Sequence, residues 1–244
     1  MSKPFLLIQL RPEDAVADEE LRAIVEHAGL APTEWVRIRA EVSGLPEIDL
    51  DVFSGIIVGG SPFDISTPAD EKSEIQRRVE LDFGQLLRKV EARDFPFLGC
   101  CSGNGLLGTH CGAVISRRYG ESVGLADVTL TEEGKADPLL LGFPERFPVL
   151  LGHKEACDST PPGTHLLATG AHCPVQMFRL RSNIYATQFH PEADAAGFRL
   201  RIQVYKNHGY FPSEDVDSLI DAVSAQPVPE SNEILRRFVD RYRS

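Results

Sequence analysis

The stretch of sequence that decides the fold is FLGCCSGNG, at residues 97–105. Its apolar start suits a short buried strand, and the small residues that follow open a predicted helix. Residues 99–103 at this junction read Gly-x-Cys-x-Gly, which is typical of a nucleophile elbow with Cys101 in place of the usual serine. The glycines let strand and helix approach closely, and a helix N-terminus favours the thiolate. Small residues also mark ordinary strand-to-helix turns, so this interpretation stays open.

Strand and helix patterns alternate on both sides of the elbow. Apolar runs predict strands at 5–10, 35–39, 53–58 and 95–98, and periodic segments predict helices between Glu13 and Gly29 and over 70–92. Shorter strands are predicted at 128–130, 147–151, 166–168, 175–180 and 184–189. This order predicts an α/β domain with a largely parallel sheet and a small antiparallel addition. From Glu192 the pattern is helical, and a last helix is predicted over 231–242. We therefore expect a domain at 1–200 and a helical extension at 201–244, packed on the same domain.

A second informative segment, YATQFHPE at residues 185–192, ends a predicted strand in His190. A cysteine nucleophile needs a general base, and the base needs an orienting partner. If this strand neighbours the strand before Cys101, His190 can face the elbow, and Glu192 can reach its distal ring nitrogen. A histidine at a strand end is more often structural, but the pairing with Glu192 and a separate elbow favours a Cys101–His190–Glu192 triad.

A pair of glycines forms the third segment. Gly59 and Gly60 follow the predicted strand at 53–58, where their backbone N–H groups can face a cavity. Together with the N–H of Ser102, the Gly60 N–H could hold the oxyanion of a tetrahedral intermediate. An ordinary turn between a strand and a loop would look the same, so the pair carries weight only in combination with the other two segments.

The three segments, in this order, resemble the class I or triad-type glutamine amidotransferases, and residues 136–179 resemble freestanding relatives of the GMP synthase amidotransferase domain. The resemblance implies a flavodoxin-like three-layer sandwich with its site at the carboxyl ends of the strands. It also implies hydrolysis of the side-chain amide of L-glutamine through a γ-glutamyl thioester on Cys101. His190 would transfer protons, Glu192 would orient it, and no metal or other cofactor is expected.

The substrate-binding positions depart from the family pattern. The family usually has glutamine where this chain has Gly105, and glutamate where it has Ser122. We expect Gly59, Gly105, Ser122 and Val123 to bind the substrate. A lost side-chain donor or acceptor could weaken glutamine binding or admit a larger compound. A γ-glutamyl hydrolase acting on another γ-glutamyl amide or peptide, and a non-catalytic regulatory module that keeps the fold, therefore remain as alternatives.

Composition limits the partners and the compartment. The chain has 244 residues with 25 Lys and Arg against 36 Asp and Glu, which gives a net charge of −11 and argues against nucleic-acid binding. No apolar run reaches the roughly 18 residues of a membrane span. An odd cysteine count, five, and a start without the apolar core of a signal peptide favour the reducing cytoplasm. The expected length of the amidotransferase unit leaves the ammonia acceptor to a separate synthetase protein.

Overall fold

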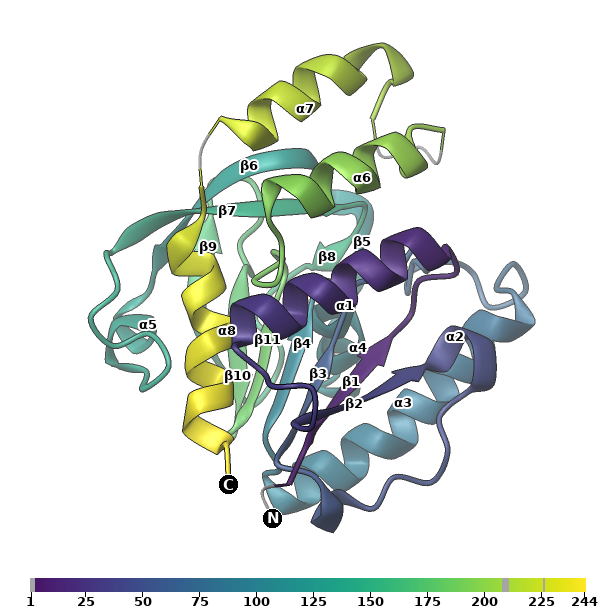
Figure 1. The fold of residues 1–244 in the computed structure, drawn as a ribbon, viewed down its shortest axis with the longest axis vertical. Helices are drawn as coiled ribbons and strands as arrows, with labels where there is room; N and C mark the ends of the chain where they lie inside the picture. The colour runs from purple at the N-terminus through teal and green to yellow at the C-terminus, as the bar shows by residue number, and fades with distance from the viewer. Residues whose placement is uncertain (1–2, 208–210, 226) are drawn as a thin grey trace.

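The computed structural model describes residues 3–207, 211–225 and 227–244, and its main feature is a mixed sheet of nine strands. The strand order is β2-β1-β3-β4-β11-β10-β9-β6-β7. Helices cover both faces of this sheet (Figure 1). The architecture is the α/β fold predicted from the sequence, with a parallel core, an antiparallel extension and helices at the C-terminal end.

The parallel half of the sheet carries the segments around the elbow. Its strands are β1 (Phe5–Gln9), β2 (Trp35–Arg39), β3 (Gly55–Val58), β4 (Phe97–Cys100) and β11 (Ile184–Thr187). Every residue of β1, β3, β4 and β11 is buried, as expected for parallel strands with helices on both faces. β4 and β11 are adjacent and parallel. Their carboxyl ends therefore meet at the same edge of the sheet, where Cys101 and His190 follow them.

The antiparallel half continues from β11. It contains β10 (Met177–Leu180), β9 (Thr164–Gly170), β6 (Glu121–Leu130) and β7 (Arg146–His153). A separate pair joins β5 (Ile115–Ser116) to β8 (Ala156–Cys157). The strands predicted at 128–130, 147–151 and 166–168 lie within β6, β7 and β9 but are shorter than these strands. Most residues of β6 are only half-buried, and β7 mixes exposed, half-buried and buried residues, so the apolar signal is weaker than in the buried parallel strands.

Alternate side chains of the central strands build two cores on opposite faces of the sheet. Leu7 packs with α1 (Asp14–Ala28) and α8 (Pro229–Tyr242), whereas Leu6 and Ile8 pack with α3 (Glu74–Arg93) and α4 (Ser102–His110). This alternation follows from the period of two in a strand. Short helical segments fill the connections, namely α2 (Ala40–Ser43), α5 (Glu132–Ala136), η1 (Leu50–Val52) and η2 (Arg117–Tyr119).

The C-terminal helices pack on the rest of the chain. They are α6 (Ala195–Tyr205), η3 (Ser213–Asp215), α7 (Val216–Ser224) and α8. α6 and α7 form a third apolar cluster with β6 and β7, and α8 buries Ile234, Leu235, Phe238 and Val239 on the α1 side. α8 starts at Pro229, two residues before the predicted start, because proline is tolerated in a first helical turn. The expected boundary at residue 200 lies within α6, and the division into two parts stays a prediction.

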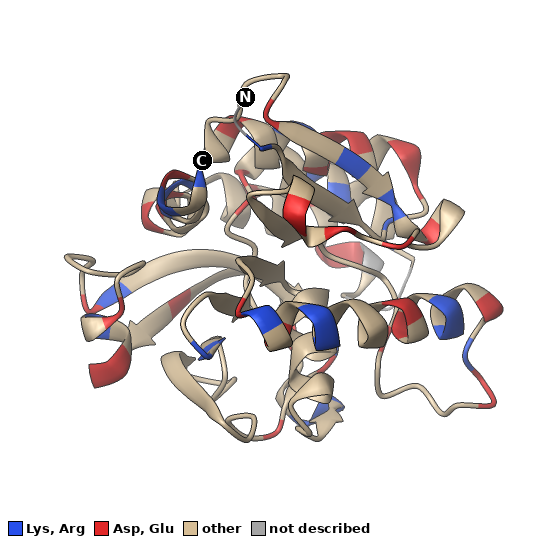
Figure 2. Cartoon of the chain, turned by 90° about the horizontal axis from the view of Figure 1, so that it is seen from below, with Lys and Arg blue, Asp and Glu red and all other residues tan. Residues whose placement is uncertain are grey.

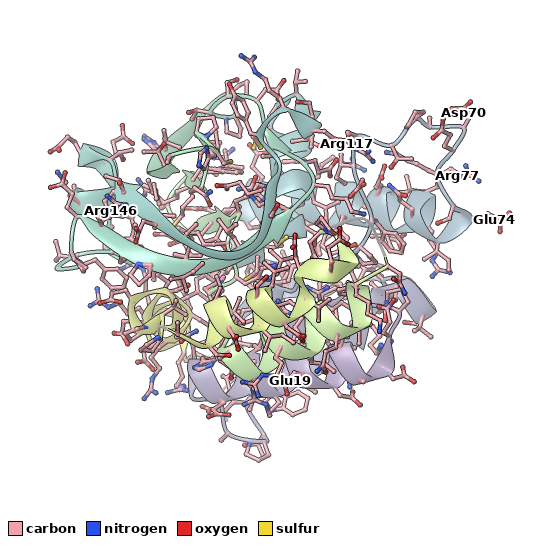
Figure 3. All side chains as sticks on the ribbon, turned by 90° about the horizontal axis from the view of Figure 1, so that it is seen from above. Glu19, Asp70, Glu74, Arg77, Arg117 and Arg146 are labelled. Carbon is pink, nitrogen blue, oxygen red and sulfur yellow. The ribbon has the colours of Figure 1, made fainter. Side chains whose placement is uncertain are left out.

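Lysine and arginine residues are interspersed with aspartate and glutamate residues over the elements seen from below (Figure 2). In the view from above, the labelled residues Asp70, Glu74 and Arg77 lie at the outer edge of the molecule (Figure 3). No helix in the described part of the chain has both the length and the apolar character needed to cross a bilayer. The five cysteines are unpaired.

Candidate active site

The elbow between β4 and α4 places Cys101 in a strained backbone conformation. Cys101 has φ 55° and ψ −92°, a region that side chains other than glycine rarely adopt. A Cβ atom at Gly99 would lie 2.8 Å from the Cα of Gly103, so the two glycines of the Gly-x-Cys-x-Gly pattern allow the close crossing of strand and helix. The N–H of Cys101 donates to the carbonyl of Thr187 at 2.8 Å, which ties the elbow to β11.

The two adjacent cysteines have different surroundings. Cys100 is completely buried in the apolar core, whereas Cys101 is partly exposed. Burial raises the pKa of Cys101 to about 12, with Arg11 and Arg201 acting in the opposite direction. Cys101 is therefore a neutral thiol near pH 7, and it needs a base to take its proton before or during attack on a substrate.

His190 and Glu192 are brought together at the end of β11. His190 Nδ1 lies 2.7 Å from Glu192 Oε1, and both side chains are buried. Burial lowers the pKa of His190, although Glu192 raises it. Burial alone would raise the pKa of Glu192, but His190 and Arg201 outweigh it and lower that pKa well below the usual range. The pair is thus a neutral imidazole beside an ionised carboxylate near pH 7.

We infer the tautomer of His190 from its short contact with the Glu192 carboxylate, although the Arg201 guanidinium, which only donates, also lies near Nδ1. A carboxylate only accepts hydrogen bonds, so the Nδ1 proton points to Glu192 and leaves the lone pair on Nε2. Arg201 Nη1 also lies 3.1 Å from Nδ1, and its Nη2 donates to Glu192 Oε1 at 3.1 Å. The guanidinium therefore stabilises the negative charge of Glu192 and holds it in place beside the ring.

A buried charged network, which was not predicted from the sequence, surrounds this pair. Arg11 Nε donates to Glu20 Oε1 at 2.7 Å, and Arg201 Nη2 lies 3.5 Å from the same oxygen. Gln9 Nε2 donates to Glu20 Oε2 at 3.1 Å, and Arg11 Nη1 donates to the hydroxyl oxygen of Tyr205 at 3.3 Å. The positive charges of Arg11 and Arg201 thus neutralise the negative charges of Glu20 and Glu192. Charges that are buried away from water require such partners.

The glycine pair lies against this network. The Gly60 N–H, predicted as an oxyanion donor, donates to Glu20 Oε1 at 3.1 Å. A Cβ at Gly60 would lie 2.2 Å from Arg11 Nη2 and 2.9 Å from His190 Cε1, which explains the glycine at this position. The carbonyl of Gly59 accepts a hydrogen bond from the Ser102 hydroxyl at 2.9 Å. The two predicted oxyanion-hole residues are therefore neighbours of Cys101 and His190.

Two adjoining hollows meet at Cys101. One is lined by polar residues on the α4 side, including Ser102, Gly105, His153, Lys154 and Glu155. The other is lined by Arg11, Val123, His190, Arg201 and Tyr205, among others. Cys101 and His190 both line the second hollow, so the thiol and the imidazole face a common space.

Two of the four predicted substrate-binding residues line the hollows. Gly105 lines the first hollow and Val123 the second, whereas Gly59 and Ser122 are not among the described residues that line either one. A Cβ at Gly105 would lie 3.3 Å from Ile65 Cγ1, so Ile65 borders the position where the family carries glutamine. Glu121, the residue before Ser122, lies 3.0 Å from His153. The β6–β7 register shifts between Glu121 and Gly124, so the pairing of the two strands is irregular around Ser122.

Comparisons with known proteins agree with this arrangement. A model of the family "Glutamine amidotransferase class-I" matches residues 21–203, which is more than half of the chain. Glutamine-hydrolyzing GMP synthase of Wolbachia pipientis wMel is 27% identical over 142 residues, covering 57% of this chain and 26% of that protein. One of the subunits of glutamine-hydrolyzing GMP synthase from Thermoplasma acidophilum is 26% identical over 147 residues, covering 60% of this chain and 66% of that polypeptide.

A solved structure gives the same fold over the whole chain. A glutamine amidotransferase from Thermotoga maritima superposes with a TM-score of 0.76 at 20% identity, covering 98% of this chain and 97% of that one. The chain matches less than two thirds of the length of each of the two GMP synthase relatives. The family model over residues 21–203, the shared fold and the cysteine elbow beside a paired histidine and glutamate show that the chain belongs to the class I glutamine amidotransferase family.

Proposed function

We propose that the protein hydrolyses the side-chain amide of L-glutamine to glutamate and ammonia, with Cys101, His190 and Glu192 as its catalytic triad. The observation that supports this proposal most directly is the 2.7 Å contact between His190 Nδ1 and Glu192 Oε1, beside the hollow shared with Cys101. A nucleophile, a base and an orienting carboxylate are the groups that amide hydrolysis through a covalent intermediate requires.

The reaction would proceed through a thioester. Cys101 Sγ attacks the carboxamide carbon as His190 Nε2 takes the thiol proton. His190 then gives this proton to the departing ammonia, and a water activated by the same Nε2 hydrolyses the γ-glutamyl thioester. The N–H groups of Gly60 and Ser102 are the proposed donors to the oxyanion. Because the Gly60 N–H is bonded to Glu20, donation to an oxyanion requires a local reorientation of its peptide or sharing of the proton.

A γ-glutamyl hydrolase is the second candidate. The absence of a side chain at Gly105, in the wall of the first hollow, favours a substrate with a larger group on the γ-amide nitrogen. A regulatory module without activity would be the third, but Cys101, His190 and Glu192 are all present at one edge of the sheet, and the last two are in hydrogen-bond contact. This observation supports an enzyme over a module that only retains the fold.

Ammonia released by the first reaction would need an acceptor. The GMP synthase relatives, one of them named as a subunit, suggest that a separate synthetase protein receives it. We propose such a cytoplasmic partner for this chain. No nucleic-acid or membrane partner is proposed, consistent with the net charge of −11.

The experiment that separates the candidates compares products. The purified protein is incubated with L-glutamine and, separately, with a γ-glutamyl peptide and a γ-glutamyl anilide, and glutamate release is measured with and without cell extract. Preference for glutamine supports the amidotransferase, and preference for the larger compounds supports the hydrolase. Cys101→Ser should abolish release, whereas Cys111→Ser, which alters a half-buried cysteine outside both hollows, should leave it unchanged. Absence of glutamate in every arm would favour the regulatory module.

A further inference from the structure

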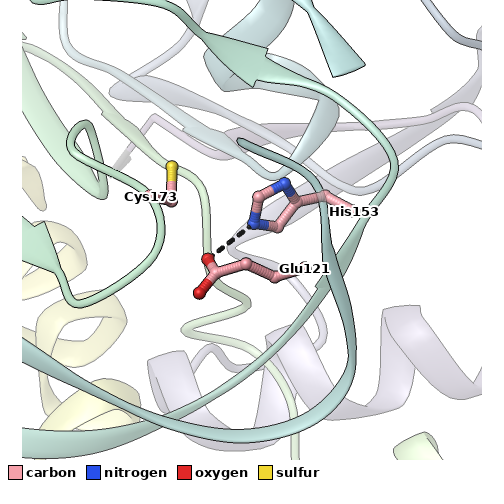
Figure 4. A group of neighbouring side chains, drawn as sticks. All are labelled: Glu121, His153 and Cys173. Carbon is pink, nitrogen blue, oxygen red and sulfur yellow. Dashed lines mark hydrogen bonds and ion pairs between the residues drawn. The ribbon is translucent and has the colours of Figure 1, made fainter. Parts of the chain in front are cut away.

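Three side chains from distant segments converge behind the first hollow (Figure 4). Glu121 begins β6, His153 ends β7, and Cys173 lies in the connection from β9 to β10. One carboxylate oxygen, one ring nitrogen and the thiol sulfur all lie within 4.8 Å of one another. His153 and Cys173 are buried, and the side chain of Glu121 is 9% exposed. None of the three belongs to the proposed catalytic triad.

The hydrogen bonds of His153 point to a cation in this cluster. Its Nδ1 lies 3.0 Å from the carbonyl oxygen of Glu155, and its Nε2 lies 3.0 Å from Glu121 Oε2. Both partners are acceptors, but a neutral imidazole has only one proton to donate. Either the ring carries a second proton, or a metal ion takes the place of that proton between Nε2 and the carboxylate. A metal-binding histidine typically donates its other N–H to a carbonyl or carboxylate, as Nδ1 is placed to do here.

A neighbouring amide also contacts the Glu121 carboxylate. Gln176 is 1% exposed, and its Nε2 donates to Glu121 Oε2 at 2.6 Å. Its Oε1 is buried and has no hydrogen-bond partner among the described atoms. The oxygen and nitrogen of a glutamine amide are interchanged by a simple rotation. In the orientation that the structure shows, Nε2 faces the carboxylate, so the unpartnered oxygen would become a ligand only after that rotation.

We propose that Glu121, His153 and Cys173 bind a zinc ion. A thiolate, an imidazole and a carboxylate are the ligand types that zinc takes, whereas magnesium and calcium prefer oxygen alone. Binding displaces the thiol proton of Cys173 to solvent and leaves the lone pair of His153 Nε2 to the metal. Three protein ligands leave one tetrahedral position for water or for the Gln176 oxygen.

The consequence for the protein is local order beside the hollow. His153 lines the first hollow together with Cys101, so an ion on Nε2 would fix one wall of it. The ion would also join the β6 and β7 ends to the connection that carries Cys173. The ligands come from positions 121, 153 and 173, with none of the short spacings of sequence-recognisable zinc sites. For this reason no metal was expected here from the sequence.

Metal content and cobalt spectroscopy test the site. The protein is purified with and without added zinc, stripped with a chelator, and titrated with Zn²⁺ or Co²⁺. We expect one tightly bound metal per chain and a thiolate-to-cobalt charge-transfer band in the ultraviolet. Cys173→Ser should abolish the band and weaken zinc binding at least about tenfold. The Cys101→Ser and Cys111→Ser proteins should retain both the charge-transfer band and the zinc affinity of the unmodified protein. Loss of the band in Cys101→Ser instead would assign the metal to the catalytic centre and overturn the proposal.

A measurement on the unmodified chain covers the case in which Cys173→Ser does not fold. X-ray absorption at the zinc edge should show one sulfur at about 2.3 Å and nitrogen or oxygen ligands at about 2.0–2.1 Å. Stoichiometric zinc without sulfur, or with two or more sulfurs, would contradict this ligand set. A chain that binds no zinc above a matched blank would show that a proton occupies the position between His153 and Glu121. Neither readout depends on glutamine hydrolysis.

Discussion

Gly60 donates its backbone N–H to the buried carboxylate of Glu20 across 3.1 Å, and the same carboxylate oxygen accepts from Arg11 at 2.7 Å. The proposed oxyanion hole is therefore built on an ion-pair network rather than on apolar packing. Glu20 is 1% exposed and comes from α1, whereas Gly60 follows β3. The first helix of the fold thus takes part in positioning the site at the sheet edge.

The first prediction concerns the charge of Glu20. Glu20→Gln keeps the shape of the side chain but leaves Arg11 and Arg201 with one negative partner fewer in a buried region. We expect the free energy of unfolding to fall by roughly 3 kcal/mol. Urea denaturation measures this free energy of unfolding. Glu26→Gln, in the same helix but with a side chain that is 64% exposed, is the matched control and should change the free energy of unfolding by less than about 1 kcal/mol. Equal effects of the two substitutions would show that the network contributes little.

The second prediction concerns the crossing of β4 and α4. An alanine Cβ at Gly99 would meet the Gly103 backbone at 2.8 Å, so strand or helix must move. Gly99→Ala should destabilise the protein by about 1–3 kcal/mol and lower its activity, because the shift displaces Cys101. Thermal melting and glutamate release are the measurements. A Cβ at Gly124 would meet nothing within 4 Å, so Gly124→Ala should be nearly neutral. A stable and active Gly99→Ala protein would contradict the packing argument.

The third prediction concerns pH. Burial lowers the pKa of His190, so its deprotonation should raise kcat/KM with a midpoint below about 6.5, the usual histidine value. Glu192 stabilises the imidazolium and raises this pKa. Glu192→Gln should therefore move the midpoint further down, while the plateau falls roughly 100-fold or more because the ring loses its orientation.

A pH–rate profile of glutamate release checks this prediction. Glu133→Gln, which changes an exposed carboxylate beside His165, should leave the profile unchanged. An upward shift of the midpoint in Glu192→Gln would mean that another group titrates.

The fourth prediction concerns substrate choice. Gly105→Gln restores the amide that the family usually carries and fills part of the first hollow, at the cost of a small shift of Ile65. The ratio of kcat/KM for glutamine to that for a γ-glutamyl peptide should rise roughly tenfold. The new side chain would add a hydrogen bond to the substrate and would leave less room for the larger group of the peptide, and both effects favour glutamine. Gly105→Ala serves as the control for space alone. An unchanged ratio in both variants would place the discriminating residues elsewhere.

The sequence predicted the parts of the site that are local in the chain. Cys101 with its flanking glycines, and His190 with Glu192 two residues later, lie in short motifs whose geometry follows from one strand end each. The fold class followed from the alternation of elements. Strand limits at β3 and β4 were displaced by about two residues, because flanking apolar residues such as Phe53 and Phe95 contact the core without joining the sheet.

The charged network could not be predicted in the same way. Glu20 contacts Arg11, Gly60 and Arg201, whose sequence separations from it range from 9 to 181 residues. The helical periodicity could have indicated that Glu20 is buried, since Glu20 lies on the same face of α1 as the buried residues Ala17 and Ile24. Arg11 also follows closely after β1, at the edge where the site lies. Glu121 lies 32 residues before His153, so their contact likewise depends on how β6 pairs with β7.

The central claim is that Cys101 is the nucleophile that forms the γ-glutamyl thioester. Incubation with a diazoketone analogue of glutamine, followed by peptide mapping by mass spectrometry, tests it most directly. We predict one adduct per chain, on Cys101, prevented by excess glutamine and slowed strongly in His190→Gln. An adduct on Cys100, Cys111, Cys157 or Cys173, or no adduct in a protein that releases glutamate, would contradict the claim.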